Sequence, residues 1–220
     1  MEFRTKVELP AKGPKIQHTD RLMIWGSCFS EHIGNLLAEH KFNCDVNPFG
    51  VLYNPMSIAT SIHCLLKKAL YQKEDLREEQ GGWYSLMHHS TFSSHEVEDC
   101  LLKINQRIAQ GHENLKQADW IIFTWGSSFV YTWKENGEIV GNCHKLSSRL
   151  FERKMVSADE ITAIYLPLLQ ELKAVRPNLQ CLFTVSPIRH LKDGLHGNQL
   201  SKANLLIAID QICSQMDFCH

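Results

Sequence analysis

Arg21-Leu-Met-Ile-Trp-Gly-Ser-Cys-Phe-Ser30 is the stretch from which the fold of this chain is best predicted. It contains a short apolar run, Leu22 to Trp25, which is followed by a glycine. The next segment, Phe29 to His40, repeats its apolar residues at helical spacing. This pattern predicts a buried strand, a tight turn and an amphipathic helix. Ser27 and Cys28 therefore fall on the turn, at or beside the helix N-cap.

The position of Cys28 indicates chemistry as well as structure. The free N–H groups and the positive dipole end of a helix N-terminus favour an anion, and a thiol held there gains nucleophilic thiolate character. Glu31 follows Cys28 at capping-box spacing. We predict that this turn is a reactive centre, with Cys28 or Ser27 as the nucleophile. The structural alternative is that Ser27 only caps the helix and Cys28 packs as a small apolar side chain.

Length and composition restrict the class of protein. The chain has 220 residues, which predicts a single domain over 1–220. Its formal net charge of −1 argues against nucleic acid or an anionic membrane as a partner. No apolar run has the length of a membrane span, and Met1 to Glu8 lacks the pattern of a secretory signal. The eight cysteines contain no Cys-x-x-Cys pair, which favours a reduced, cytoplasmic protein.

Helical and apolar segments alternate along the rest of the chain. Further helices are predicted over 57–71, 96–110, 157–175 and 199–216, and further strands over 42–46, 118–126 and 179–185. Pro167 is expected to kink the third of these helices or to displace its start. Asn136-Gly137 predicts a hairpin turn, and Asp217 to His220 falls where another strand is expected to begin. This alternation predicts an α/β fold with a parallel sheet.

Small and reactive residues follow three of the predicted strands. Ser27 and Cys28 follow the first, and Gly126 with two serines follows the strand over 118–126. The loop that carries His190 follows the strand over 179–185. Because ligands bind at the carboxyl ends of the strands in open α/β sheets, we expect these residues to gather at one edge.

Six blocks of the sequence together resemble a known family. They are Gly26-Ser-Cys-Phe29, Asn47-Pro-Phe-Gly50, His89-Ser-Thr-Phe-Ser93, Asn142-Cys-His-Lys145, Ser186-Pro-Ile-Arg-His190 and Asn198-Gln-Leu-Ser-Lys202. In this order they resemble the GSCFA domain family, which is grouped with the SGNH, or GDSL-like, hydrolases. The resemblance implies a flavodoxin-like, three-layer α/β/α fold. It also implies ester hydrolysis or acyl transfer without a cofactor, on a small-molecule ester or an acetylated glycan.

The resemblance also implies roles for individual residues. Cys28 occupies the nucleophile position of the Gly-Asp-Ser-Leu block, and Ser27 occupies that of the supporting aspartate. Gly50 matches a glycine that donates to the oxyanion. The block that starts at Gly126 lacks the asparagine donor of these hydrolases, and Asn142 is a candidate to replace it.

The sequence does not determine which residue is the general base. The candidates are His144, His190 and His196, since histidine titrates near neutral pH. Asp193-Gly-Leu-His196 fits the Asp-x-x-His block of SGNH enzymes, although it follows the fourth strand instead of the fifth. Arg189 is a candidate to bind an anionic group of the substrate. Family members continue beyond residue 220, so the resemblance implies a domain that is incomplete at its C-terminus and lacks the usual base.

Three function classes are compatible with these observations. The first is an ester hydrolase or acetyltransferase that acts through Cys28. The second is a non-catalytic binding module that keeps the cleft but lacks the base. The third is a metal protein, for which the adjacent pairs are His63-Cys64, His88-His89, Cys143-His144 and Cys219-His220. None of these pairs has the spacing of a structural zinc site, so no metal is predicted. The sequence does not predict the oligomeric state.

Overall fold

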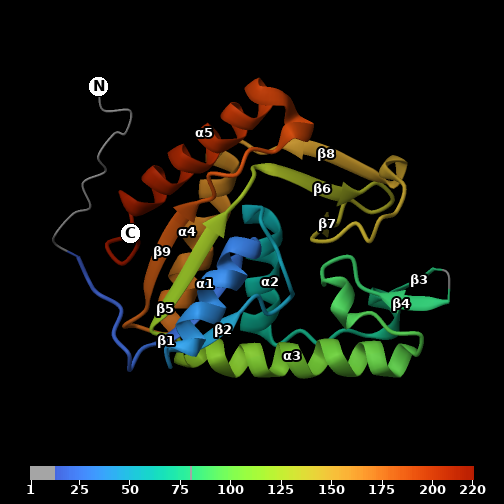
Figure 1. Cartoon of the computed structure of the whole chain (residues 1–220), viewed down its shortest axis with the longest axis horizontal. Helices are drawn as coiled ribbons and strands as arrows, with labels where there is room; N and C mark the ends of the chain where they lie inside the picture. The colour runs from blue at the N-terminus through green and yellow to red at the C-terminus, as the bar shows by residue number, and fades with distance from the viewer. Residues whose placement is uncertain (1–12, 80) are drawn as a thin grey trace.

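A four-stranded parallel sheet forms the centre of the molecule (Figure 1). The computed structural model describes residues 13–79 and 81–220. The strand order is β2-β1-β5-β9, and the strands are β1 (Arg21–Gly26), β2 (Asn43–Val46), β5 (Trp120–Trp125) and β9 (Gln180–Val185). Met23 lies between Asp45 and Ile121 in register. The predicted α/β fold with a parallel sheet is therefore confirmed.

Five α-helices cover the two faces of this sheet. They are α1 (Cys28–Glu39), α2 (Pro55–Lys67), α3 (Val97–Gln117), α4 (Ala158–Val175) and α5 (Gly194–Cys213). Leu22 and Ile24 pack with Leu37 of α1 on one face. Met23 and Trp25 pack on the other face, in the core that includes α2, α3, α4 and α5. The chain steps from β1 to β2 in one direction and from β1 to β5 and β9 in the other. Right-handed crossovers therefore put α1 opposite the other helices, giving three α/β/α layers.

Two small antiparallel sheets extend from this core. One joins β6 (Phe129–Trp133), β7 (Ile139–Val140) and β8 (Phe151–Met155), and the other pairs β3 (Arg77–Glu79) with β4 (Gly82–Tyr84). Four 3₁₀ turns complete the chain: η1 (Lys73–Asp75), η2 (Ser90–Phe92), η3 (Ser148–Leu150) and η4 (Leu191–Asp193). The predicted hairpin is confirmed, since β6 and β7 pair around Gly137, whose φ is +75°.

Several boundaries differ from those predicted. The N-cap of α1 is Ser27, whose carbonyl accepts from the Glu31 N–H, so Ser27 and Cys28 lie at and beside the cap as predicted, and the capping-box spacing of Cys28 and Glu31 has no role. The capping box of Ser157 and Glu160 is confirmed. Helix α4 starts as predicted and continues through Pro167. The alternative that Pro167 displaces the start of the helix is therefore wrong. Its ring lies on the exposed side, where a proline displaces no core side chain.

The C-terminal segment of the chain lies against β9. Cys219 forms an isolated parallel bridge with Cys181 of β9 where the further strand was expected, although residues 217–220 form no strand of their own. None of the helices in the described part of the chain is long and apolar enough to span a membrane. Met1 to Glu8, the stretch judged to lack a secretory signal, lies outside the described residues.

Candidate functional site

The turn after β1 presents Cys28 to solvent. Ser27 is half-buried, and its hydroxyl accepts from the Phe29 N–H at 3.3 Å, which caps α1. Cys28 is the first residue of α1 and is exposed, whereas the other seven cysteines are buried or half-buried. All eight are free thiols. A reagent in solution can therefore reach Cys28, which is the first residue of α1, at the positive dipole end of the helix.

Asn47, at the end of β2, lies against this turn. Its side-chain oxygen accepts from the Gly26 N–H at 3.0 Å, and its side-chain nitrogen is buried without a hydrogen-bond partner among the described residues. A buried amide N–H without a partner costs free energy, so a ligand oxygen at this position would be stabilised. Asn47 was not among the predicted site residues, although it begins the Asn-Pro-Phe-Gly block of the resemblance.

Gly50 has a packing role in the same loop. Its N–H donates to the Asn47 carbonyl at 2.8 Å, so that donor is already in use. Its φ is +81°, and a Cβ at this position would lie 2.2 Å from the Cβ of His89. Only glycine therefore allows His89 to lie this close to the loop. His89 was part of the resemblance but was not selected as a site residue.

His190 lies over the end of β5, the strand beside β1. Its backbone N–H donates to the Asn198 side chain at 3.0 Å, and its Nε2 lies 3.2 Å from the Gly126 carbonyl. A carbonyl only accepts, so Nε2 carries the proton and the neutral ring keeps a free lone pair on Nδ1. Tyr53 stacks on the ring at 6.2 Å and accepts the Gly126 N–H on its carbonyl oxygen.

His144 and Asn142 lie together on another loop. His144 Nε2 donates to the carbonyls of Ser85 and His88 at 2.8 and 3.1 Å, and its backbone N–H donates to the Asn142 side chain. Burial lowers the pKa of His144. Both residues are thus held against the 85–88 loop, and no hydrogen bond joins them to Ser27 or Cys28.

The Asp193-x-x-His196 pair is not joined in the structure. The buried Asp193 carboxylate forms an ion pair with Arg153 of β8. His196 is exposed in the first turn of α5, because that helix begins at Gly194, inside the segment predicted as a loop. Arg189 is exposed beside His190. The fold therefore brings Arg189 and His190 to the carboxyl edge of the sheet, with Asp193 bound to a different partner.

Residues of α5 form hydrogen bonds with the segments that follow β5 and β9. The Ser201 hydroxyl accepts from the Ser128 N–H at 2.8 Å and lies 3.3 Å from the Ser127 hydroxyl. Lys202, the next residue, donates to the carbonyls of Gly126 and Ser186 at 2.5 and 2.6 Å. Ser201 and Lys202 were not among the predicted site residues, although both lie in the Asn198-to-Lys202 block.

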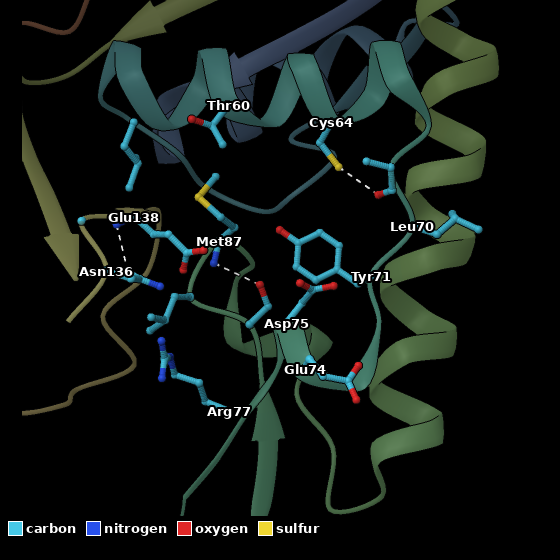
Figure 2. A pocket seen from close by; sticks show the side chains of 15 residues that line it. Thr60, Cys64, Leu70, Tyr71, Glu74, Asp75, Arg77, Met87, Asn136 and Glu138 are labelled. Atoms are coloured by element: carbon cyan, nitrogen blue, oxygen red, sulfur yellow. Dashed lines mark hydrogen bonds between the residues drawn. The ribbon is translucent and has the colours of Figure 1, made fainter. Parts of the chain in front are cut away.

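Two cavities are associated with these elements. The one next to His190 measures about 90 Å³ and is lined by Tyr53, Ser127, Phe129, Tyr131, Arg153, His190, Lys192 and Asp193. A larger hollow of about 820 Å³ lies between α2, the 69–77 segment and the β6–β7 turn. Figure 2 shows Thr60 and Cys64 of α2 above it and Tyr71 facing Glu138 across it. None of the predicted site residues lines the larger hollow.

The described residues contain no group of three histidine, cysteine or acidic side chains that could hold a metal ion. A comparison with protein families matches the model of the GSCFA family to residues 21–220. No curated protein and no solved structure matches the chain.

Proposed function

The chain belongs to the GSCFA family over residues 21–220, and from this premise we propose that it hydrolyses or transfers ester-linked acyl groups through the Cys28 thiol. The observation that carries the proposal is the exposed thiol at the first residue of α1, at the carboxyl end of β1. The resemblance to SGNH hydrolases supports it, since their nucleophile falls at this position. A small-molecule ester or an acetylated glycan is the proposed substrate.

His190 and Asn47 supply the remaining chemical groups in this proposal. Nδ1 of His190 takes the thiol proton as sulfur attacks the ester carbonyl carbon. The N–H groups at the start of α1 and the side-chain N–H of Asn47 stabilise the oxyanion. The carbon–oxygen bond to the alcohol then breaks, and the imidazolium returns its proton to the leaving alkoxide. Water or an acceptor hydroxyl attacks the thioester, which releases the acyl group and restores the thiol.

Intact-mass measurement after incubation with 4-nitrophenyl acetate tests this proposal. We expect one acetyl adduct on the wild-type chain and on Ser27→Ala, and none on Cys28→Ala. Cys213→Ala is the matched control. Cys213 is also a free thiol but is less exposed than Cys28, so this variant should keep the adduct.

Other outcomes would reject parts of the proposal. An adduct lost only with Ser27→Ala would move the nucleophile to Ser27. Absence of both an adduct and ester turnover in every variant would reject acyl transfer and favour the non-catalytic binding module.

A further inference from the structure

Lys202 carries an uncompensated positive charge at the carboxyl edge of the sheet. The residue is half-buried on α5, and its ammonium donates to two backbone carbonyls, those of Gly126 and Ser186. None of the ion pairs among the described residues includes Lys202. His190 Nε2 and Lys202 Nζ bind the same Gly126 oxygen, at 3.2 and 2.5 Å. This cation therefore lies beside the proposed base.

A second lysine, Lys192, lines the small cavity next to His190. Asp193 is the only carboxylate that lines this cavity, and Arg153 already neutralises it. The Lys192 ammonium donates to the Tyr131 hydroxyl at 2.9 Å without an acidic partner among the described residues. Lys192 and Lys202 thus leave this corner of the site with two positive charges that no described carboxylate offsets.

We infer that this cavity binds an anionic group of the substrate, a carboxylate or a phosphate, so that the ester used in the proposed reaction is an anionic one. The inference rests on the proposed function for the reacting ester, whereas the anion site itself rests on Lys192, which lines the cavity, and on the nearby charge of Lys202. Because His190 lines the cavity, the anionic group would be held beside the proposed base. The volume of about 90 Å³ equals about three water molecules, which suits a single carboxylate or phosphate.

The hydrogen-bonding capacity of Lys202 supports this inference. An ammonium has three N–H donors, and the two carbonyls use two of them. Burial lowers the pKa of Lys202, which shows that its surroundings disfavour the charge. Lys202 does not itself line the cavity, but it shares the Gly126 oxygen with His190, which does, so an anion in the cavity would offset that cost through Coulomb attraction.

Direct binding tests the anion site without catalysis. Inorganic phosphate and succinate are titrated into the Cys28→Ala chain by isothermal calorimetry. We expect saturable binding of at least one anion, and Lys192→Met and Lys202→Met should each raise its Kd by about five- to tenfold. Lys67→Met, at an exposed lysine in the last turn of α2, should leave the Kd unchanged. The anion with the lower Kd identifies the group.

The contrary results are distinct from those of the acylation test. Absence of saturable binding by both anions, or Kd values in both lysine variants that equal the Kd of the parent Cys28→Ala chain, would overturn the anion site even if Cys28 is acetylated. With the anion site intact, the wild-type chain should be acylated faster by mono-4-nitrophenyl succinate than by neutral 4-nitrophenyl acetate, which has the same leaving group. That preference should fall about five- to tenfold in Lys192→Met. Equal rates for anionic and neutral esters would overturn the substrate class, and absence of all acylation would reject the proposed function alone.

Discussion

His190 provides the most direct test of the chemistry at the scale of single residues. Its Nε2–H is held by the Gly126 carbonyl, so Nδ1 is the atom free to accept the thiol proton. We expect His190→Ala to lower the rate of Cys28 acetylation by about 10²- to 10⁴-fold, the usual range for loss of a general base. The growth of the acetyl adduct with time, followed by intact mass, measures this rate.

His196→Ala is the matched control, because His196 is exposed and lies in the first turn of α5. Its rate should equal that of the wild type. An equal loss in the two variants would contradict a specific role for His190, and a loss confined to His144→Ala would assign the base to His144.

His88 makes stability depend on pH. Its ring is buried and packs against Phe49, Tyr71 and Phe92, and burial lowers its pKa from 6.5 to about 3. Between these values the unfolded chain binds a proton that the folded chain excludes. His88 therefore makes the free energy of unfolding fall by about 1.4 kcal/mol per pH unit as the pH drops below 6.5.

Urea unfolding at pH 7.5, 6.0 and 5.0 measures that dependence. We expect His88→Phe to remove most of this slope while it keeps the aromatic packing. His32→Phe, at an exposed histidine of α1, should keep the wild-type slope. A slope that is unchanged in His88→Phe would mean that His88 titrates normally in the folded chain.

At the scale of elements, local sequence predicted the strand–turn–helix unit because near neighbours decide it. The apolar run of β1 and the Ser27 cap of α1 both depend on residues a few positions apart. The candidate nucleophile followed from the same local pattern. Strand β8 was missed because Glu152, Arg153 and Lys154 give it a charged centre, and it forms only by pairing with β6.

The rest of the candidate site depends on contacts that no local pattern encodes. Asn47 meets Gly26 across 21 positions of the chain, and Lys202 meets Gly126 across 76. The sequence indicates that an asparagine and a lysine are present, but the tertiary fold decides which backbone groups they reach. The sequence likewise shows two histidines, His190 and His196, without a local feature that distinguishes them. The start of α5 at Gly194 determines where each lies.

Pro167 lowers the stability of α4. It lies inside the helix, where it cannot donate to the Ala163 carbonyl, and it is exposed. We expect Pro167→Ala to raise the free energy of unfolding by about 1–3 kcal/mol, since proline is the least favourable residue in a helix interior. Urea unfolding measures this change, and Gln170→Ala, at another exposed position of α4, is the control. A gain no larger than that of Gln170→Ala would show that the surrounding structure already accommodates the ring.

At the scale of the whole molecule, packing and chemistry are separated along the strands. The apolar residues of β1, β5 and β9 form a continuous core with α2, α3, α4 and α5. The reactive and charged groups instead lie on the segments that follow these strands. Substitution of an exposed group at this edge therefore leaves the core contacts intact, so Cys28→Ala and Lys192→Met should report on chemistry more than on folding.

Residues 217–220 pair with β9 at the edge of the sheet and provide a test of the whole assembly. Phe218 and Cys219 are buried in the main core. The Cys181 and Phe183 N–H groups of β9 donate to the carbonyls of Phe218 and His220, both at 2.8 Å. We expect deletion of 217–220 to lower the free energy of unfolding by about 3–5 kcal/mol, as for loss of a buried aromatic side chain. It should also promote self-association, because β9 would become an unpaired edge. Urea unfolding and sedimentation velocity measure the two effects. His220→Ala, which removes only an exposed side chain and its bond to Gln180, should change neither, and a deletion as stable as this control would mean that the segment adds nothing to the sheet.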